Sequence, residues 1–127
     1  MISYLLLESD ATPAARAVWE TDPDWVVPPL WRSEFLSVLV QSARSQMLER
    51  QDLPILWQTA AGLLLPREIE PNEEIILDCS LDRGISAYDA HYVSLAIELG
   101  ALLVSGDQRL VRKCADVAVS LEDFAAQ

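Results

Sequence analysis

The chain has few of the residues that zinc sites and disulfide frameworks need. It contains two cysteines, Cys79 and Cys114, without CxxC spacing, and a single histidine, His91. Those three residues cannot form a zinc site without an unusual set of ligands. We therefore expect Cys79 and Cys114 to be buried or half-buried thiols in a reducing compartment.

Long apolar runs are also missing. The longest are residues 5–7, 38–40, 63–65 and 101–104, whereas a membrane span needs about 20 residues. The N-terminus has no basic region followed by a long apolar stretch, so no secretory signal is expected. These absences predict a cytoplasmic protein that does not use a membrane.

Basic residues are scarce as well. Nine Lys and Arg residues face 20 Asp and Glu residues, which gives a net charge of −11. This balance argues against a protein that holds nucleic acid on a broad basic surface. It does not argue against a nuclease, because clustered carboxylates first bind a divalent metal ion that then meets the phosphate.

The length and the order of the elements predict one α/β domain over residues 1–127. Asn72 and Ser86 are typical helix caps, and Gly84 and Gly100 are typical helix stops. Helices alternate with short apolar strands, which favours a helix-rich three-layer α/β/α sandwich around a mostly parallel sheet. Helices are expected over residues 13–20, 30–50, 53–64, 73–82, 87–99, 107–113 and 121–125, and strands over residues 25–27, 101–104 and 117–119. In the helix over 30–50, the predicted buried stripe is Leu36, Leu39, Val40, Ala43 and Met47.

Most of the acids need no functional explanation; Glu68, Glu70, Glu73 and Glu74, for example, are interpreted as a solvated or capping run. Three acids differ, because each lies within apolar sequence. Glu34 is either a functional carboxylate or an exposed first-turn residue paired with Arg32. Asp89 is either functional or a helix cap or partner of Arg83. Asp107 directly follows a predicted strand, so it lies at the carboxyl edge of the sheet, where ligands bind in such folds, or serves as a plain N-cap.

Taken together, the three acids are more informative than each alone. Clustered carboxylates repel one another unless a cation neutralises them. Mg²⁺ and Mn²⁺ prefer oxygen ligands, and they activate water for an in-line attack on phosphate. Glu34, Asp89 and Asp107 are therefore predicted both as metal ligands and as catalytic residues, and no base from His or Lys is needed.

Other polar and aromatic residues have two interpretations each. Ser105 either bonds to Asp107 or a metal-bound water, or serves the turn alone. Arg109, Arg112 and Lys113 either face RNA phosphates or form a solvated helix face, and we take Ser105, Arg109 and Arg112 as the candidate substrate-binding residues. His91 is expected to be structural or on the surface. Packing rather than base stacking is expected for the tryptophans, which are Trp19, Trp25, Trp31 and Trp57.

Residues 85–110 resemble a known family. The motifs Ser-Ala-Tyr-Asp-Ala and Leu-Gly-Ala-Leu-Leu-Val-Ser-Gly-Asp-Gln-Arg-Leu resemble the C-terminal half of PIN domains of the VapC toxin type. The segment Val-Val-Pro-Pro-Leu-Trp-Arg-Ser-Glu-Phe, residues 26–35, resembles the family's strand and following helix. Glu34, Asp89 and Asp107 match three of the family's four acids. The resemblance implies Mg²⁺- or Mn²⁺-dependent RNA cleavage by a homodimer that a cognate antitoxin blocks.

The fourth acid of the family has no counterpart here. PIN domains open with an apolar strand that ends in Asp-Thr-Asn or Asp-Thr-Ser, whereas residues 1–7 resemble the segment that comes just after that motif, and Asp10 lies in a different context. The chain is therefore predicted to lack the family's first strand and first catalytic Asp, either because its start is misassigned or because it is a degenerate member. The leading prediction is an endoribonuclease toxin. The alternative is an impaired module that binds antitoxin or RNA without cutting.

Overall fold

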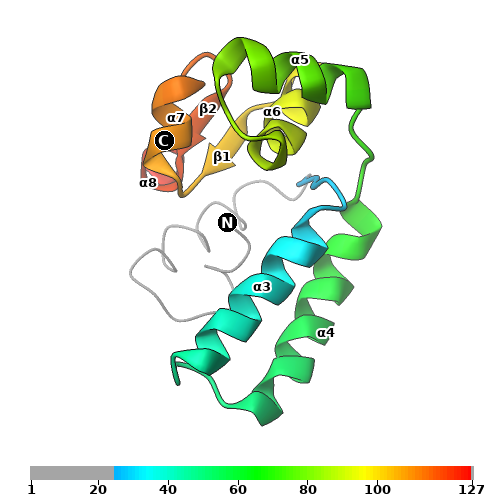
Figure 1. Ribbon diagram of the computed structural model, residues 1–127, viewed down its shortest axis with the longest axis vertical. Coiled ribbons are helices and arrows are strands. Elements are labelled where there is room, and N and C mark those ends of the chain that lie inside the picture. Colours follow the sequence, from blue (N-terminus) through cyan, green and yellow to red (C-terminus); the bar gives the residue numbers. More distant parts are fainter. Residues whose placement is uncertain (1–24, 127) are drawn as a thin grey trace.

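The structure is a computed structural model that describes residues 25–126 (Figure 1). Several predictions concern residues outside this range. They are the resemblance of residues 1–7 to a family segment, the helix over 13–20, the packing of Trp19, and the absence of the family's first strand and first Asp. Two groups of elements are apparent. One is the pair of long helices α3 and α4, and the other contains α5, α6, α7, α8 and the two strands.

Helices α3 (Trp31–Arg44) and α4 (Leu53–Leu64) lie side by side and share one apolar cluster. The 3-10 turn η1 (Arg50–Asp52) leads into α4, and η2 (Leu65–Arg67) follows it. The indole of Trp31 stacks on that of Trp57 with 5.3 Å between ring centroids. The buried residues of this cluster are Trp31, Phe35, Leu39, Ala60 and Leu64.

The predicted buried stripe of α3 is wrong, except that Leu39 is buried and Ala43 is half-buried. Leu36 and Val40 are 45% and 43% exposed, and Met47 is 68% exposed. The buried side instead contains Trp31, Phe35, Leu39 and Ser42. This side packs on α4, and local sequence spacing does not show where α4 lies.

Helix α3 also ends six residues before the predicted end. Gln46 adopts a left-handed conformation with φ of 64°, although it is not glycine. Its N–H donates to Ala43 O (3.1 Å), and the N–H of Met47 donates to Ser42 O (2.9 Å). This is the Schellman arrangement, which satisfies the last carbonyls of a helix. It turns the chain towards α4.

Helices α5 (Glu73–Arg83) and α6 (Ala87–Leu99) begin and end close to the predicted residues. The Asn72 side chain accepts hydrogen bonds from two backbone N–H groups of α5, and Ser86 accepts one from the N–H of Asp89. Gly84 and Gly100 end the two helices with φ of 63° and 59°. Left-handed backbone of this kind favours glycine, so both predicted stops are confirmed.

The sheet of the described residues is parallel. Strand β1 (Leu103–Ser105) pairs with β2 (Ala118–Ser120), with Leu103 opposite Ala118, and α7 (Gln108–Lys113) joins the two. Helix α8 (Leu121–Ala125) follows β2 directly. The predicted strand over 25–27 is reduced to one parallel bridge between Val27 and Glu68. A second apolar cluster is formed by residues of α5, α6, α7, β2 and the segments that join them. Its buried members are Ile76, Cys79, Ile85, Ala90, Val93, Leu110, Cys114 and Ala118.

The helix-rich α/β class with parallel strands is therefore confirmed. The carboxyl end of β1 leads through Gly106 to Asp107, as the sequence predicted. Within residues 25–126, no helix is long and apolar enough to cross a membrane.

Candidate active site

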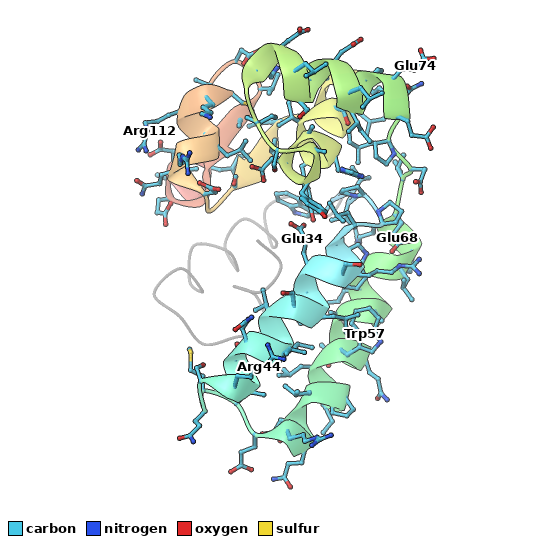
Figure 2. All side chains as sticks on the ribbon, viewed as in Figure 1. Glu34, Arg44, Trp57, Glu68, Glu74 and Arg112 are labelled. Carbon is cyan, nitrogen blue, oxygen red and sulfur yellow. The ribbon has the colours of Figure 1, made fainter. Side chains whose placement is uncertain are left out.

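Glu34 lies in the first turn of α3, where the helix dipole favours a negative charge. Its neighbours Trp31 and Phe35 are almost fully buried, whereas Glu34 itself is exposed. Its carboxylate Oε1 accepts a hydrogen bond from the hydroxyl of Tyr92, a residue of α6 that is 58 positions away in the chain. Figure 2 shows Glu34 at the end of α3 that faces the group formed by α5 and α6.

Asp89 lies on the same helix as Tyr92. It is half-buried in the first turn of α6, and Tyr92 follows three residues later, so the two side chains occupy neighbouring positions on one face. The pKa of the Tyr92 phenol is raised well above its usual value, first by burial, then by the bond to Glu34 and by the negative charges of Glu34 and Asp89. The hydrogen bond thus places Glu34 at Tyr92, one helical turn from Asp89 on α6.

Asp107 is the N-cap of α7. Its Oδ1 accepts hydrogen bonds from the N–H groups of Arg109 (3.0 Å) and Leu110 (3.2 Å), and its own N–H donates to Ser105 Oγ (3.0 Å). Ser105 is buried, and Asp107 is exposed. The N-cap interpretation of Asp107 is thus confirmed. The bond from its backbone N–H to Ser105 is a contact within the turn, which agrees with the turn role considered for Ser105.

The three acids supply the carboxylate oxygens that Mg²⁺ and Mn²⁺ prefer. Their assembly into one site is a separate question. Among the described residues, no three side chains of His, Cys, Asp or Glu lie close enough together to hold a metal ion. The donor chemistry fits such an ion, and the joint metal site of Glu34, Asp89 and Asp107 stays a prediction.

The ion pairs proposed as structural roles for Glu34 and Asp89 are wrong. Arg32 bonds to Glu68 rather than to Glu34. Arg83 makes a two-pronged pair with Asp116, at 2.7 and 2.8 Å, rather than with Asp89. Nor does Asp89 cap α6, because Ser86 does so. The hydrogen bonds between Arg83 and Asp116 lower the pKa of Asp116 and raise that of Arg83.

The basic residues of α7 differ from one another. Arg109 and Arg112 are exposed, and Figure 2 shows Arg112 on the outer side of α7. Lys113 instead donates to the carbonyl of Gly84 (2.8 Å), at the end of α5. Phosphate binding by Arg109 and Arg112, like substrate contact by Ser105, stays a prediction.

Sequence reasoning missed two residues near Glu34. Tyr92 was not singled out, although its spacing of three residues from Asp89 on a helix could have indicated it. Glu68 was assigned to a solvated or capping run, which is wrong. Its carboxylate accepts from Trp31 Nε1 (2.7 Å) and from Arg32, and its side chain is 12% exposed. The hydrogen bond from Arg32 is the main cause that lowers the pKa of Glu68.

The remaining candidate residues have structural roles. His91 Nδ1 lies 2.6 Å from Ala87 O, a contact within its own helix that agrees with the predicted structural role. The tryptophans that stack, Trp31 and Trp57, pack in the α3–α4 cluster as expected. Cys79 and Cys114 are buried free thiols, and burial raises the pKa of Cys79.

Comparisons with known proteins agree with the resemblance of the motifs. No curated protein and no solved structure matches the chain. The family profile described as PIN domain matches residues 1–116, which is most of the chain and includes all three acids. PIN domains are generally nucleases. With this match over a helix-rich fold with parallel strands, the chain belongs to the PIN domain family.

Proposed function

We propose that this protein is a metal-dependent endoribonuclease of the VapC type, the toxin of a toxin–antitoxin pair. The observation that carries the proposal is the hydrogen bond from Tyr92 to Glu34, which links Glu34 on α3 to the helix that contains Asp89. These carboxylates come from two helices that are far apart in the sequence. Because the chain belongs to a family of proteins that are generally nucleases, we interpret these carboxylates as part of a nuclease site.

The proposed cofactor is Mg²⁺ or Mn²⁺, which Glu34, Asp89 and Asp107 would hold. When bound, it would activate water for attack on a phosphodiester and stabilise the developing charge. The chain's own residues do the rest. Ser105 fixes the backbone of Asp107 through the bond to its N–H. Arg109 and Arg112, which are exposed on α7, would bind the RNA backbone, since a guanidinium suits phosphate contacts.

The proposed partners are RNA, a cognate antitoxin and a second copy of the chain, in the cytoplasm and without a membrane. Exposed apolar side chains support protein partners. Leu77 and Leu81 on α5 are 61% and 83% exposed, and Leu36 and Val40 on α3 are also exposed. Apolar side chains that gather on a surface often mark a site of protein association.

A second candidate function is binding of RNA or antitoxin without cleavage. One observation favours it, namely that no group of three metal-ligating side chains is assembled among residues 25–126. An incomplete set of carboxylate ligands would hold a divalent ion more weakly than a complete set. With this second function the protein would have the same fold and belong to the same family, but it would not cleave RNA.

The test is cleavage of a structured RNA in Mn²⁺ by the 127-residue chain and by Glu34→Gln, Asp89→Asn and Asp107→Asn. Matched controls are Glu74→Gln, an exposed first-turn acid of α5, and Asp82→Asn, an exposed acid near its end. Each site variant should lose at least about 100-fold in rate, because an inner ligand should matter more than the 10- to 100-fold typical of outer-shell residues. The controls should cut like the wild type.

The outcomes separate the two candidates. Mn²⁺ binding and RNA binding without cleavage would favour the second function. A further version, extended upstream with an apolar strand that ends in Asp-Thr-Asn, tests the predicted absence of the first acid, since its cleavage should then exceed that of the 127-residue chain. Failure of all versions to cut RNA or bind Mn²⁺ would refute the nuclease proposal.

A further inference from the structure

The hydroxyl of Tyr92 holds the carboxylate of Glu34 across two helices. Tyr92 is half-buried on α6, between a turn that contains Asp89 and the buried residues Val93 and Ser94. Glu34 is exposed on α3, and its Oε1 accepts the phenolic hydrogen. The donor is thus fixed by packing, whereas the acceptor is a long side chain on the surface.

This difference in anchoring determines what the bond does. A free Glu side chain samples several rotamers, and holding it in one costs conformational entropy. A donor on a packed helix keeps it in one place before any ligand arrives. Tyrosine is neutral at ordinary pH, so it donates without neutralising the carboxylate as Arg or Lys would. The bond to Oε1 is also compatible with a cation at Oε2, because a carboxylate has two oxygens.

We propose that Tyr92 is a positioning residue that fixes the Glu34 carboxylate beside Asp89, so that both carboxylates can bind one divalent cation. This inference rests on the proposed function, because it gives Glu34 a metal to bind. Outer-shell donors of this kind orient ligands, and their loss typically costs 10- to 100-fold in metal affinity or activity.

A purely structural role is the competing explanation. Tyr92 would then tie α3 to α6, and its loss would lower the stability of the fold without changing the metal affinity. The hydroxyl can be removed alone with Tyr92→Phe, which keeps the ring and its packing. Tyr88, one turn earlier on α6 and 66% exposed, provides the matched control Tyr88→Phe.

The experiment measures Mn²⁺ affinity by electron paramagnetic resonance for the wild type, Tyr92→Phe, Tyr88→Phe, Glu34→Gln and the double variant Glu34→Gln/Tyr92→Phe. Tyr92→Phe should weaken Mn²⁺ binding about 10-fold or more. Tyr88→Phe should stay within about twofold of the wild type. On the Glu34→Gln background, Tyr92→Phe should have little further effect, because the group that it positions is gone. Thermal unfolding of the metal-free proteins reports any structural effect separately.

A second readout does not need a metal. In the metal-free protein, the ¹³Cζ resonance of Tyr92 should shift on Glu34→Gln, while that of Tyr88 stays in place. An unchanged Tyr92 resonance would overturn the inference. So would equal Mn²⁺ affinity of Tyr92→Phe and wild type, even where Tyr92→Phe is less stable, and the proposed nuclease would survive that result. A wild type that binds no Mn²⁺ would refute the proposed function, and the positioning role with it.

Discussion

Asp107 combines two roles that a pair of substitutions can separate. It caps α7 through Oδ1, and in the proposed nuclease it is also a metal ligand. Asn is as good an N-cap as Asp, whereas Ala provides no acceptor. Asp107→Asn should therefore keep the fold and lose the metal chemistry, while Asp107→Ala should lose both.

The size of the cap effect follows from the geometry. Asp107 accepts from two backbone N–H groups, and replacing such a cap by Ala costs about 1 kcal/mol. The unfolding entropy is about 2.1 cal/mol/K per residue, which for 127 residues is about 270 cal/mol/K. The expected fall in Tm for Asp107→Ala is therefore about 4 °C. Asp107→Asn gives up only the favourable charge at the helix start, about 0.5 kcal/mol or less.

The assay pairs thermal unfolding without metal with Mn²⁺ binding and RNA cleavage. Asn72→Ala is the matched control, because Asn72 caps α5 in the same way and has no proposed part in the site. It should lower Tm by a similar amount and leave Mn²⁺ affinity unchanged. Wild-type Mn²⁺ affinity and cleavage in Asp107→Asn would show that Asp107 is a cap alone. Equal destabilisation by Asn and Ala would refute the cap argument itself.

Three further predictions concern the frame around the site. Glu68→Ala should cost about 1–3 kcal/mol in urea unfolding at pH 7, because the buried Trp31 N–H loses its acceptor. Since the pKa of Glu68 is lowered from 4.5 in the fold, the contribution of its charge should be complete above about pH 5 and be lost as the pH falls below 4.5. The difference between wild type and variant should therefore narrow in acid, and a constant difference down to about pH 2 would contradict this. Ser86→Ala should cost about 1 kcal/mol by loss of the α6 cap, measured by thermal unfolding, with Ser86→Asn restoring most of it. Gly100→Ala should cost about 1–2 kcal/mol because its φ is +59°; a Cβ would meet nothing within 4 Å, so an unaffected Tm would show that the turn relaxes.

The sequence predicted the local features of the fold well. Helix caps and stops depend on residues that are three or four positions apart, so Asn72, Gly84, Ser86 and Gly100 could be assigned without knowledge of the fold. The same holds for Asp107, whose two partners lie within three residues. The strands predicted over 101–104 and 117–119 lie within two residues of β1 and β2, because runs of apolar residues bounded by turn residues identify them. The strand predicted over 25–27 is only a bridge at Val27.

Long-range pairings could not be predicted in this way. The bond between Tyr92 and Glu34 joins residues 58 positions apart, and the pair of Arg32 and Glu68 spans 36 positions. Nothing near Arg32 in the sequence distinguishes Glu68 from Glu34 as its partner. The buried side of α3 was misplaced for a related reason, because the position of α4 decides it. Whether the three acids assemble as one metal site is a long-range question of the same kind.

The two apolar clusters of the described residues have no buried member in common. Regions with separate cores can open as separate cooperative units, each with its own free energy of opening. Glu34 belongs to the α3–α4 unit, whereas Asp89 and Asp107 belong to the other. A local opening of α3 and α4 would thus carry Glu34 away while β1, β2 and α6 stay folded. In amide hydrogen exchange, such a protein loses protection in two stages, and the weaker unit sets how long the hydrogen bond between Tyr92 and Glu34 persists.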